Sequence, residues 1–231
     1  NKDSRTYHFI STYKDNPFLE QTIIDEIESL EHKNRVLWTV YGLGLQAMAE
    51  GLVFPEFEIV DEFPVNAKQV AAGLDFGYSS DPTAIVKCGI LDGGLYLDEQ
   101  CYRTHMLTSE IIKELKKLGL FVYADSADPR LIQEIANAGI IIFPADKYKG
   151  SVMGGLFKMM EYKLCVTKRS VNYIRELKNY VYEQNKDGKF INQPIDAYNH
   201  LIDGTRYYTI GKLLGKVLTS KQYSKEDLGI Y

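Results

Sequence analysis

Three aspartates carry the clearest chemical signal in this sequence: Asp75, Asp125 and Asp203. Asp75 is the middle residue of a GLDFG run late in an apolar strand, and Asp125 ends the apolar run 121–125. An ionised carboxylate there is costly unless it is paired or binds a metal ion, and such oxygen ligands suit Mg²⁺ or Mn²⁺. Either aspartate alone could instead cap a loop or the following helix.

Asp203 belongs to a predicted helix that also carries a histidine. At 3.6 residues per turn, one stripe of this helix holds Asp196, His200, Asp203 and Tyr207. A helix that presents an imidazole and a carboxylate together can complete a metal site. Asp196 is more simply interpreted as the helix N-cap. His200 could be a metal ligand or an ordinary packed or exposed histidine.

Carboxylates from two strands and a helix, with no nucleophilic Ser or Cys beside a base, point to phosphodiester hydrolysis by metal-activated water. Two divalent cations, Mg²⁺ or Mn²⁺, about 3.5 to 4 Å apart would activate the water and stabilise the leaving oxygen. The sequence therefore predicts Asp75, Asp125 and Asp203 as catalytic residues and metal ligands.

The charge of the chain is unevenly placed. The 231 residues have a formal net charge of -4, yet ten Lys or Arg stand against four Asp or Glu between Lys147 and Lys189. Such side chains could hold a DNA backbone without reading its sequence, or could be solvated helix charges. The candidates are a loop after the strand that ends at Pro144, with Lys147 and Lys149, and the pair Lys168 and Arg169.

Composition indicates a soluble, intracellular protein with no membrane partner. The hydrophobic content of 45% supports one sizeable core, and no apolar run approaches the roughly 18 residues that span a bilayer. The first residues have no signal-peptide character. The three cysteines, Cys88, Cys101 and Cys165, are far apart and suggest neither a disulfide framework nor a zinc site.

The order of the predicted elements indicates an α/β fold with a mixed central sheet flanked by helices. Three strand-like runs, 69–78, 84–90 and 95–103, predict an antiparallel meander, with a hairpin signal at Asp92-Gly93-Gly94. Alternating helices and strands follow and predict parallel pairing. Their ranges are helix 108–118, strand 121–125, helix 129–138, strand 140–144, strand 162–167, helix 170–184, a turn at 186–188 and helix 196–210.

The first part of the chain is expected to be a connector. Two short helices, 18–33 and 35–50, cannot bury much by themselves. We therefore expect residues 1–62 to form a helical connector or linker segment, and residues 63–231 to form the domain that carries the aspartates.

Four stretches in this order resemble a known family. They are YKDNPFL at 13–19, GLDFG with DPTA at 73–84, ADSADP at 124–129, and the helix that contains Asp203. Together they resemble the nuclease domain of the large terminase subunit of tailed bacteriophages, which has a ribonuclease H-like fold. By similarity, Asp75, Asp125 and Asp203 match the catalytic acids of that family. Asp81 matches an auxiliary acid and His200 a metal ligand of some members.

The resemblance implies a metal-dependent endonuclease that cuts concatemeric double-stranded viral DNA during genome packaging. It implies three partners: the portal protein, the small terminase subunit and an ATPase motor domain. The implied location is the cytoplasm of the infected host, at the procapsid portal, and not the mature virion. No G-x-x-x-x-G-K-[ST] phosphate loop occurs, so we expect a carboxy-terminal fragment whose first 60 or so residues connect to a missing ATPase domain.

Other interpretations fit the same residues. A ribonuclease H-like junction resolvase would share the acids but act as a dimer on branched DNA. A nucleotide-binding module of the actin-like type would bring Asp75 to a phosphate and its metal ion. A third possibility is a docking domain that has kept the fold and lost its activity.

Overall fold

A computed structural model of the chain describes residues 10–33, 38, 42–44 and 51–213. The chain divides into two compact units, residues 1–51 and 52–231. In the first unit, a 3-10 turn, η1 (Tyr13–Asp15), precedes helix α1 (Gln21–Lys33), and the Tyr13 hydroxyl donates a hydrogen bond to Glu28 at 3.0 Å. Helix α1 falls within the predicted helix 18–33, whereas the helix predicted at 35–50 lies largely outside the described residues.

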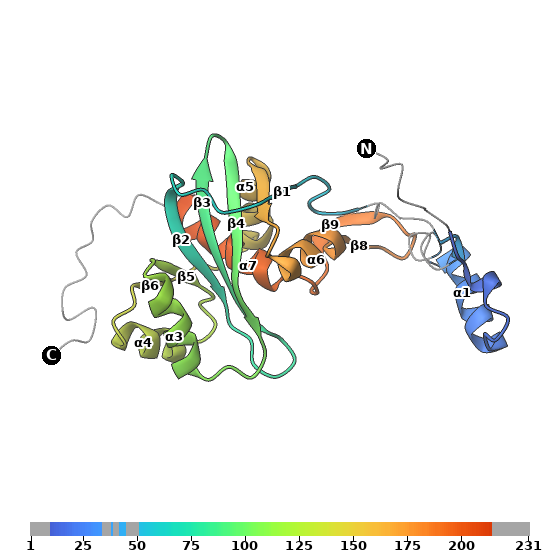
Figure 1. Ribbon diagram of the computed structural model, residues 1–231, viewed down its shortest axis with the longest axis horizontal. Coiled ribbons are helices and arrows are strands. Elements are labelled where there is room, and N and C mark those ends of the chain that lie inside the picture. Colours follow the sequence, from blue (N-terminus) through green and yellow to red (C-terminus); the bar gives the residue numbers. More distant parts are fainter. Residues whose placement is uncertain (1–9, 34–37, 39–41, 45–50, 214–231) are drawn as a thin grey trace. The chain divides into compact units, whose positions relative to one another are not determined.

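The second unit is built on a seven-stranded mixed sheet (Figure 1). Its strands follow the order β1-β7-β4-β3-β2-β5-β6. Strands β2, β3 and β4 form an antiparallel meander, while β5 and β6 extend the sheet in parallel beyond β2. The predicted mixed α/β sheet is therefore confirmed. The bounds are β1 (Glu58–Val60), β2 (Lys68–Asp75), β3 (Thr83–Leu91), β4 (Gly94–Arg103), β5 (Val122–Ala124), β6 (Ile142–Pro144) and β7 (Lys163–Thr167).

Helices cover both faces of this sheet (Figure 1). One face packs on α3 (Thr108–Leu118) and α4 (Pro129–Asn137). The other packs on α5 (Ser151–Met160), α6 (Val171–Asn179) and α7 (His200–Tyr208), which runs into η3 (Thr209–Leu213).

Alternation along β2 assigns its side chains to these two faces. Ala72 and Leu74 belong to the core beneath α3 and α4, and Ala71 belongs to the core beneath α5 to α7. Because successive side chains of a strand point to opposite faces, Asp75 shares the face of Ala71 and therefore points toward α7.

Two predicted helices have different bounds in the structure. The helix predicted at 170–184 ends at Asn179, and the chain continues into a hairpin of β8 (Tyr182–Gln184) and β9 (Phe190–Pro194). The predicted turn at 186–188 lies between these strands. The helix predicted from Asp196 begins at His200, so Asn199 occupies the N-cap position and the N-cap interpretation of Asp196 is wrong.

Strand β1 lies before the domain start expected at residue 63 and pairs in parallel with β7. The division into a connector and a nuclease domain stays a prediction. None of the helices in the described ranges is long and apolar enough to cross a membrane. The three cysteines are buried and unpaired.

Candidate active site

Asp75 is the last residue of β2 and one of the few buried carboxylates, with 9% of its surface exposed. Its Oδ2 lies 3.1 Å from Nδ1 of His200. Burial raises the pKa of Asp75 to about 6; the hydrogen bond to His200 opposes this shift, and the charges of Asp203 and Asp125 add to it. Negative charges therefore converge on this carboxylate.

Asp125 follows β5 directly and lies at the same edge of the sheet. The parallel register pairs Leu74 with Ala124, and the Asp125 backbone N–H donates to the carbonyl of Leu74 at 3.2 Å. Asp75 directly follows Leu74 and Asp125 directly follows Ala124, so the two aspartates lie at the adjacent ends of neighbouring strands, as the sequence predicted. The Asp125 carboxylate forms an ion pair with Lys147.

Helix α7 carries the third aspartate, Asp203, and lies close to β2 where a glycine of the helix contacts a glycine of the strand. A Cβ atom built on Gly73 would lie 2.0 Å from the carbonyl oxygen of Gly204, so only glycine allows this approach. This contact lies two residues before Asp75 and one after Asp203. On the first turn of α7, Asp203 accepts a hydrogen bond from the buried Arg206 at 2.9 Å.

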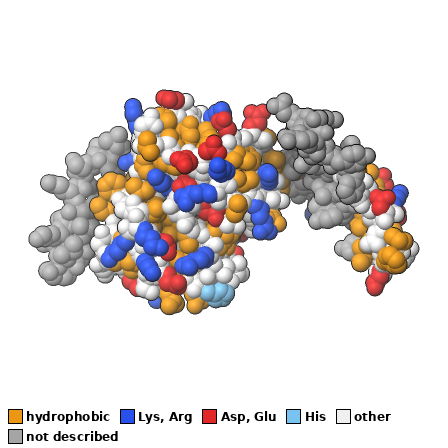
Figure 2. Space-filling view, in the orientation of Figure 1, with side chains coloured by type: hydrophobic (Ala, Val, Ile, Leu, Met, Phe, Trp, Pro, Cys, Tyr) orange, Lys and Arg blue, Asp and Glu red, His pale blue; other side chains and the backbone are white. Residues whose placement is uncertain are grey.

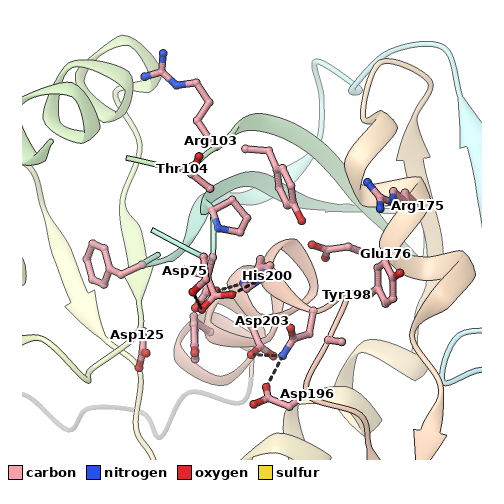
Figure 3. A pocket seen from close by; sticks show the side chains of 18 residues that line it. Asp75, Arg103, Thr104, Asp125, Arg175, Glu176, Asp196, Tyr198, His200 and Asp203 are labelled. Carbon is pink, nitrogen blue, oxygen red and sulfur yellow. Dashed lines mark hydrogen bonds and ion pairs between the residues drawn. The ribbon is translucent and has the colours of Figure 1, made fainter. Parts of the chain in front are cut away.

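His200 links two of the predicted ligands. Its Nδ1 contacts Asp75, and its Nε2 lies 3.8 Å from the exposed Asp81, in the loop between β2 and β3. The hydrogen bond to Asp75 is the main cause that raises the pKa of His200. We call Asp75, Asp81, Asp125, His200 and Asp203 the acid centre. All five line one cavity of about 1010 Å³, and Figure 3 shows four of them around it.

The donor atoms of the acid centre suit a hard divalent cation, because four of the five residues offer carboxylate oxygens. Within the described ranges, no group of three or more His, Cys, Asp or Glu side chains is arranged to hold a metal ion. The carboxylates are instead drawn to cations of the chain: Asp125 to Lys147 and Asp203 to Arg206. Burial is the main cause that raises the pKa of Asp75, and the charges of Asp203 and Asp125 add to it; a bound cation would favour the ionised carboxylates, so this crowding of acids fits a cation.

The four basic residues predicted to contact DNA have different surroundings. Lys147 pairs with Asp125, and Lys149 is exposed on the same loop. Lys168 pairs with Asp61 at 2.9 Å, and Arg169 makes two hydrogen bonds to the buried Asp98. None of the four lines the cavity.

Sequence reasoning gave no role to several further residues that line the cavity, and four of them bear on its chemistry. Arg103 ends β4, Arg175 and Glu176 lie on α6, and Tyr198 precedes α7. The Arg175 guanidinium lies over the Tyr198 ring, 5.7 Å from its centre (Figure 3). The sequence predicted only a helix over 170–184, and its charged residues do not show locally which of them face the cavity.

A known protein family matches the part of the chain that contains this site. The model of the terminase RNase H-like domain matches residues 75–210, a span that begins at Asp75 and includes the whole acid centre. The chain belongs to the terminase RNase H-like domain family. The resemblance predicted from the sequence is confirmed.

Individual relatives agree with the family. The chain is 30% identical over 219 residues to the large terminase subunit of Bacillus phage SPP1, covering 85% of this chain and 50% of that protein. It is 26% identical over 216 residues to the PBSX phage terminase large subunit of Bacillus subtilis (strain 168), covering 87% and 50%. The chain thus spans about half the length of these terminase subunits.

A solved structure of a terminase nuclease domain is also similar to this chain. The crystal structure of the large terminase nuclease domain from bacteriophage SPP1 with bound Mn is 27% identical and has a TM-score of 0.59. The match covers 68% of this chain and 96% of that domain. The chain therefore carries a large-terminase nuclease domain.

Proposed function

We propose that this terminase domain is a divalent-metal-dependent endonuclease that hydrolyses phosphodiester bonds of double-stranded DNA. In the phage, it cuts concatemeric viral DNA during genome packaging. The observation that carries the proposal is the convergence of Asp75, Asp125 and Asp203 from three elements onto one cavity. The match to a relative whose structure contains Mn supports it.

The acid centre is the proposed site of two divalent cations, Mg²⁺ or Mn²⁺. Asp75, Asp125 and Asp203 would hold them, with His200 and Asp81 as further ligands. Bound there, the cations supply Lewis acids that activate water and stabilise the leaving oxygen of the scissile phosphodiester. Lys147 would leave Asp125 free when a cation binds.

Residues around the acid centre orient the carboxylates and hold the substrate. The hydrogen bond from His200 fixes the Asp75 carboxylate, and Arg206 fixes Asp203. Arg103 and Arg175 line opposite parts of the cavity (Figure 3). We assign Arg175 to the DNA phosphates, because guanidinium groups form paired hydrogen bonds to phosphate oxygens, whereas Arg103 is already paired with Glu110 at 3.5 Å.

The proposed partners are double-stranded DNA, the phage portal protein, the small terminase subunit and the ATPase motor domain of a full-length large subunit. The two curated relatives are about twice as long as the stretch matched here, which supports an additional domain in a full-length protein. The proposed location is the cytoplasm of the infected host, at the procapsid portal, and not the mature virion.

A plasmid-nicking assay with Mn²⁺ or Mg²⁺ tests the proposal. We expect the native chain to nick and linearise supercoiled duplex DNA and EDTA to abolish cutting. Asp75→Ala, Asp125→Ala and Asp203→Ala are each expected to lose roughly 100-fold or more, since even groups that only orient metal ligands contribute about 10- to 100-fold. Asp187→Ala, in the exposed turn of the β8–β9 hairpin, is the matched control.

Two outcomes would overturn the proposal: cutting retained in all three variants, or cutting by the native chain in EDTA. A four-way junction cut far faster than linear duplex would favour a junction resolvase. ATP binding without metal-dependent cutting would favour the actin-like alternative.

A further inference from the structure

Glu176 is a buried carboxylate beside the acid centre. It lies on α6, only 1% of its surface is exposed, and it lines the same cavity as Asp75 (Figure 3). Burial raises the pKa of Glu176 to about 7, while backbone hydrogen bonds and the nearby His200 oppose the shift. A carboxylate buried in this way costs free energy, so its contacts must account for its presence.

Besides Tyr102 of β4, those contacts are with the first turn of α7. Oε2 of Glu176 accepts hydrogen bonds from the backbone N–H groups of Leu201 at 2.9 Å and Ile202 at 3.1 Å. The first N–H groups of a helix have no carbonyl partner within that helix. Glu176 thus caps α7 from another helix, and its negative charge lies where the helix dipole is positive.

The side chain of the N-cap residue does not cap this helix. Asn199 is at the N-cap position, but its side chain makes no cap hydrogen bond. The amide instead donates to Asp196 at 3.3 Å and to Asp203 at 3.4 Å. The start of α7 is therefore fixed by a direct contact with α6 rather than by its own N-cap side chain.

We propose that Glu176 is a positioning residue of the acid centre: its carboxylate fixes the first turn of α7 and so places His200 and Asp203 against Asp75. His200 directly precedes Leu201, and Asp203 directly follows Ile202, so the two bonded N–H groups lie between them. The roles of His200 and Asp203 as metal ligands rest on the proposed nuclease function.

The surroundings of the second carboxylate oxygen of Glu176 argue against a role in core packing alone. Oε1 makes no hydrogen bond of ordinary geometry within the described part of the chain, although the Tyr102 side chain lies close enough to lower the pKa of Glu176. A buried acceptor without a partner destabilises a fold, and an apolar side chain would fill the space at lower cost. The two bonds to α7 are the gain that offsets this cost.

Two conservative variants separate position from charge. Glu176→Gln keeps the side-chain length and a carbonyl oxygen that can accept both N–H groups, but it has no charge. Glu176→Asp keeps the charge but is one methylene shorter, so it cannot reach the same N–H groups. Glu114→Ala is the control, because Glu114 is a carboxylate on α3 that pairs with Lys117 on the surface.

We expect Glu176→Asp to lower Mn²⁺-dependent nicking roughly 10- to 100-fold, the range for groups that orient metal ligands, and Glu176→Gln to stay within about fivefold of native. The loss should fall mainly on turnover and Mn²⁺ affinity rather than on the KM for DNA. A second readout needs no cleavage: the His200 ring NMR signals of the metal-free chain, assigned with His200→Gln. Because the Glu176 charge also raises the pKa of His200, the signals are compared at a pH above the titration of the ring, where they should move in Glu176→Asp and stay near native in Glu176→Gln.

Equal losses in Glu176→Gln and Glu176→Asp, or a native-like Glu176→Asp, would overturn the positioning role. Thermal unfolding followed by circular dichroism shows whether each variant is folded. If the native chain fails to cut DNA, the proposed nuclease function fails, but the His200 signals still test the link between Glu176 and α7.

Discussion

Asp75 is held in a place that opposes its ionisation. Its side chain is only 12% exposed, and Asp203 and Asp125 add negative charge beside it. Its pKa of about 6, against an ordinary value of 3.8, corresponds to roughly 3 kcal/mol of unfavourable free energy when the group is ionised in the folded chain. The metal-free site is therefore a source of instability near neutral pH.

Asp75→Asn should stabilise the metal-free chain at neutral pH. A pKa raised in the folded state contributes stability that is fully present below pH 3.8 and is lost as the pH rises through about 6. The gain from Asp75→Asn should thus be about 1–3 kcal/mol at pH 7.5, less any loss from its bond to His200, and much smaller at pH 4.5. Urea denaturation in EDTA at the two pH values measures it.

The control for this prediction is Asp187→Asn in the exposed hairpin turn, which should change stability by less than about 0.5 kcal/mol. A gain for Asp75→Asn that is the same at both pH values, or a loss at pH 7.5, would contradict the assigned cause. Asp75→Asn should also be unable to cut DNA, so its stability and its activity would change in opposite directions.

At the scale of elements, the contact between Gly73 of β2 and Gly204 of α7 sets the geometry of the acid centre. The added Cβ of alanine at Gly73 would lie 2.0 Å from a backbone oxygen, which no side-chain rearrangement can relieve. In the sequence, Gly204 directly follows the last aspartate, Asp203. The structure explains Gly204 by the closeness of the strand and the helix.

Gly73→Ala should push α7 away from β2. We expect a destabilisation of about 1–3 kcal/mol or more, as for overpacked cores, together with a loss of Mn²⁺-dependent nicking. Gly154→Ala in α5 is the matched control, because its added Cβ would meet only the hydroxyl of the exposed Tyr148, at 3.1 Å. That variant should be neutral or stabilise by up to about 1 kcal/mol. Chemical denaturation and the nicking assay report both effects.

The elements also show what local sequence can predict. The end of β5 followed from an apolar run that terminates in aspartate, whereas the strand predicted at 69–78 ends earlier, at Asp75. The parallel direction of the two strands then placed both carboxylates at one edge of the sheet. The end of α6 did not follow, because Tyr180-Val181-Tyr182 suits a helix or a strand, and pairing with β9 selects the strand. Similarly, β1 depends on its pairing with β7, which lies about a hundred residues later.

The candidate site shows the same limit. Asp75, Asp125 and Asp203 were found from strand ends, helix spacing and family resemblance. Glu176 could not be found, because its role is a contact between two helices that are far apart in the sequence. Arg175 was missed for the same reason: on α6 alone it is one of several charges, and only the fold places it in the cavity.

At the scale of the whole molecule, the net charge of -4 disfavours tight binding to nucleic acid. On the face shown in Figure 2, Lys and Arg side chains are interspersed with Asp and Glu rather than forming a continuous stripe. Much of the excess basic charge between Lys147 and Lys189 is also engaged in ion pairs, with Asp125, Glu161, Glu58, Asp61 and Asp98 as the carboxylate partners. A few local contacts should therefore carry the affinity for DNA.

The isolated chain should bind duplex DNA weakly and without sequence preference, with a Kd on the order of 10⁻⁴ to 10⁻⁶ M at physiological salt. Arg175 lines the cavity and makes no ion pair within the described residues, so Arg175→Ala should reduce the slope of log K against log salt by about 0.9. Lys168→Ala and Arg169→Ala, which test the sequence-based assignment, should reduce it less, because Asp61 and Asp98 already neutralise these side chains.

Fluorescence anisotropy with two unrelated duplexes, at several salt concentrations and in Ca²⁺ or EDTA to prevent cutting, measures these slopes. Lys116→Ala is the control, because Lys116 is exposed near the end of α3, beside the start of β5 and thus at the sheet edge opposite Asp125. Its slope should equal that of the native chain. Tight binding to only one duplex, or an unchanged slope for Arg175→Ala beside a large change for Arg169→Ala, would move the DNA path away from the cavity. The cutting site and the DNA-binding surface would then be separate regions of the molecule.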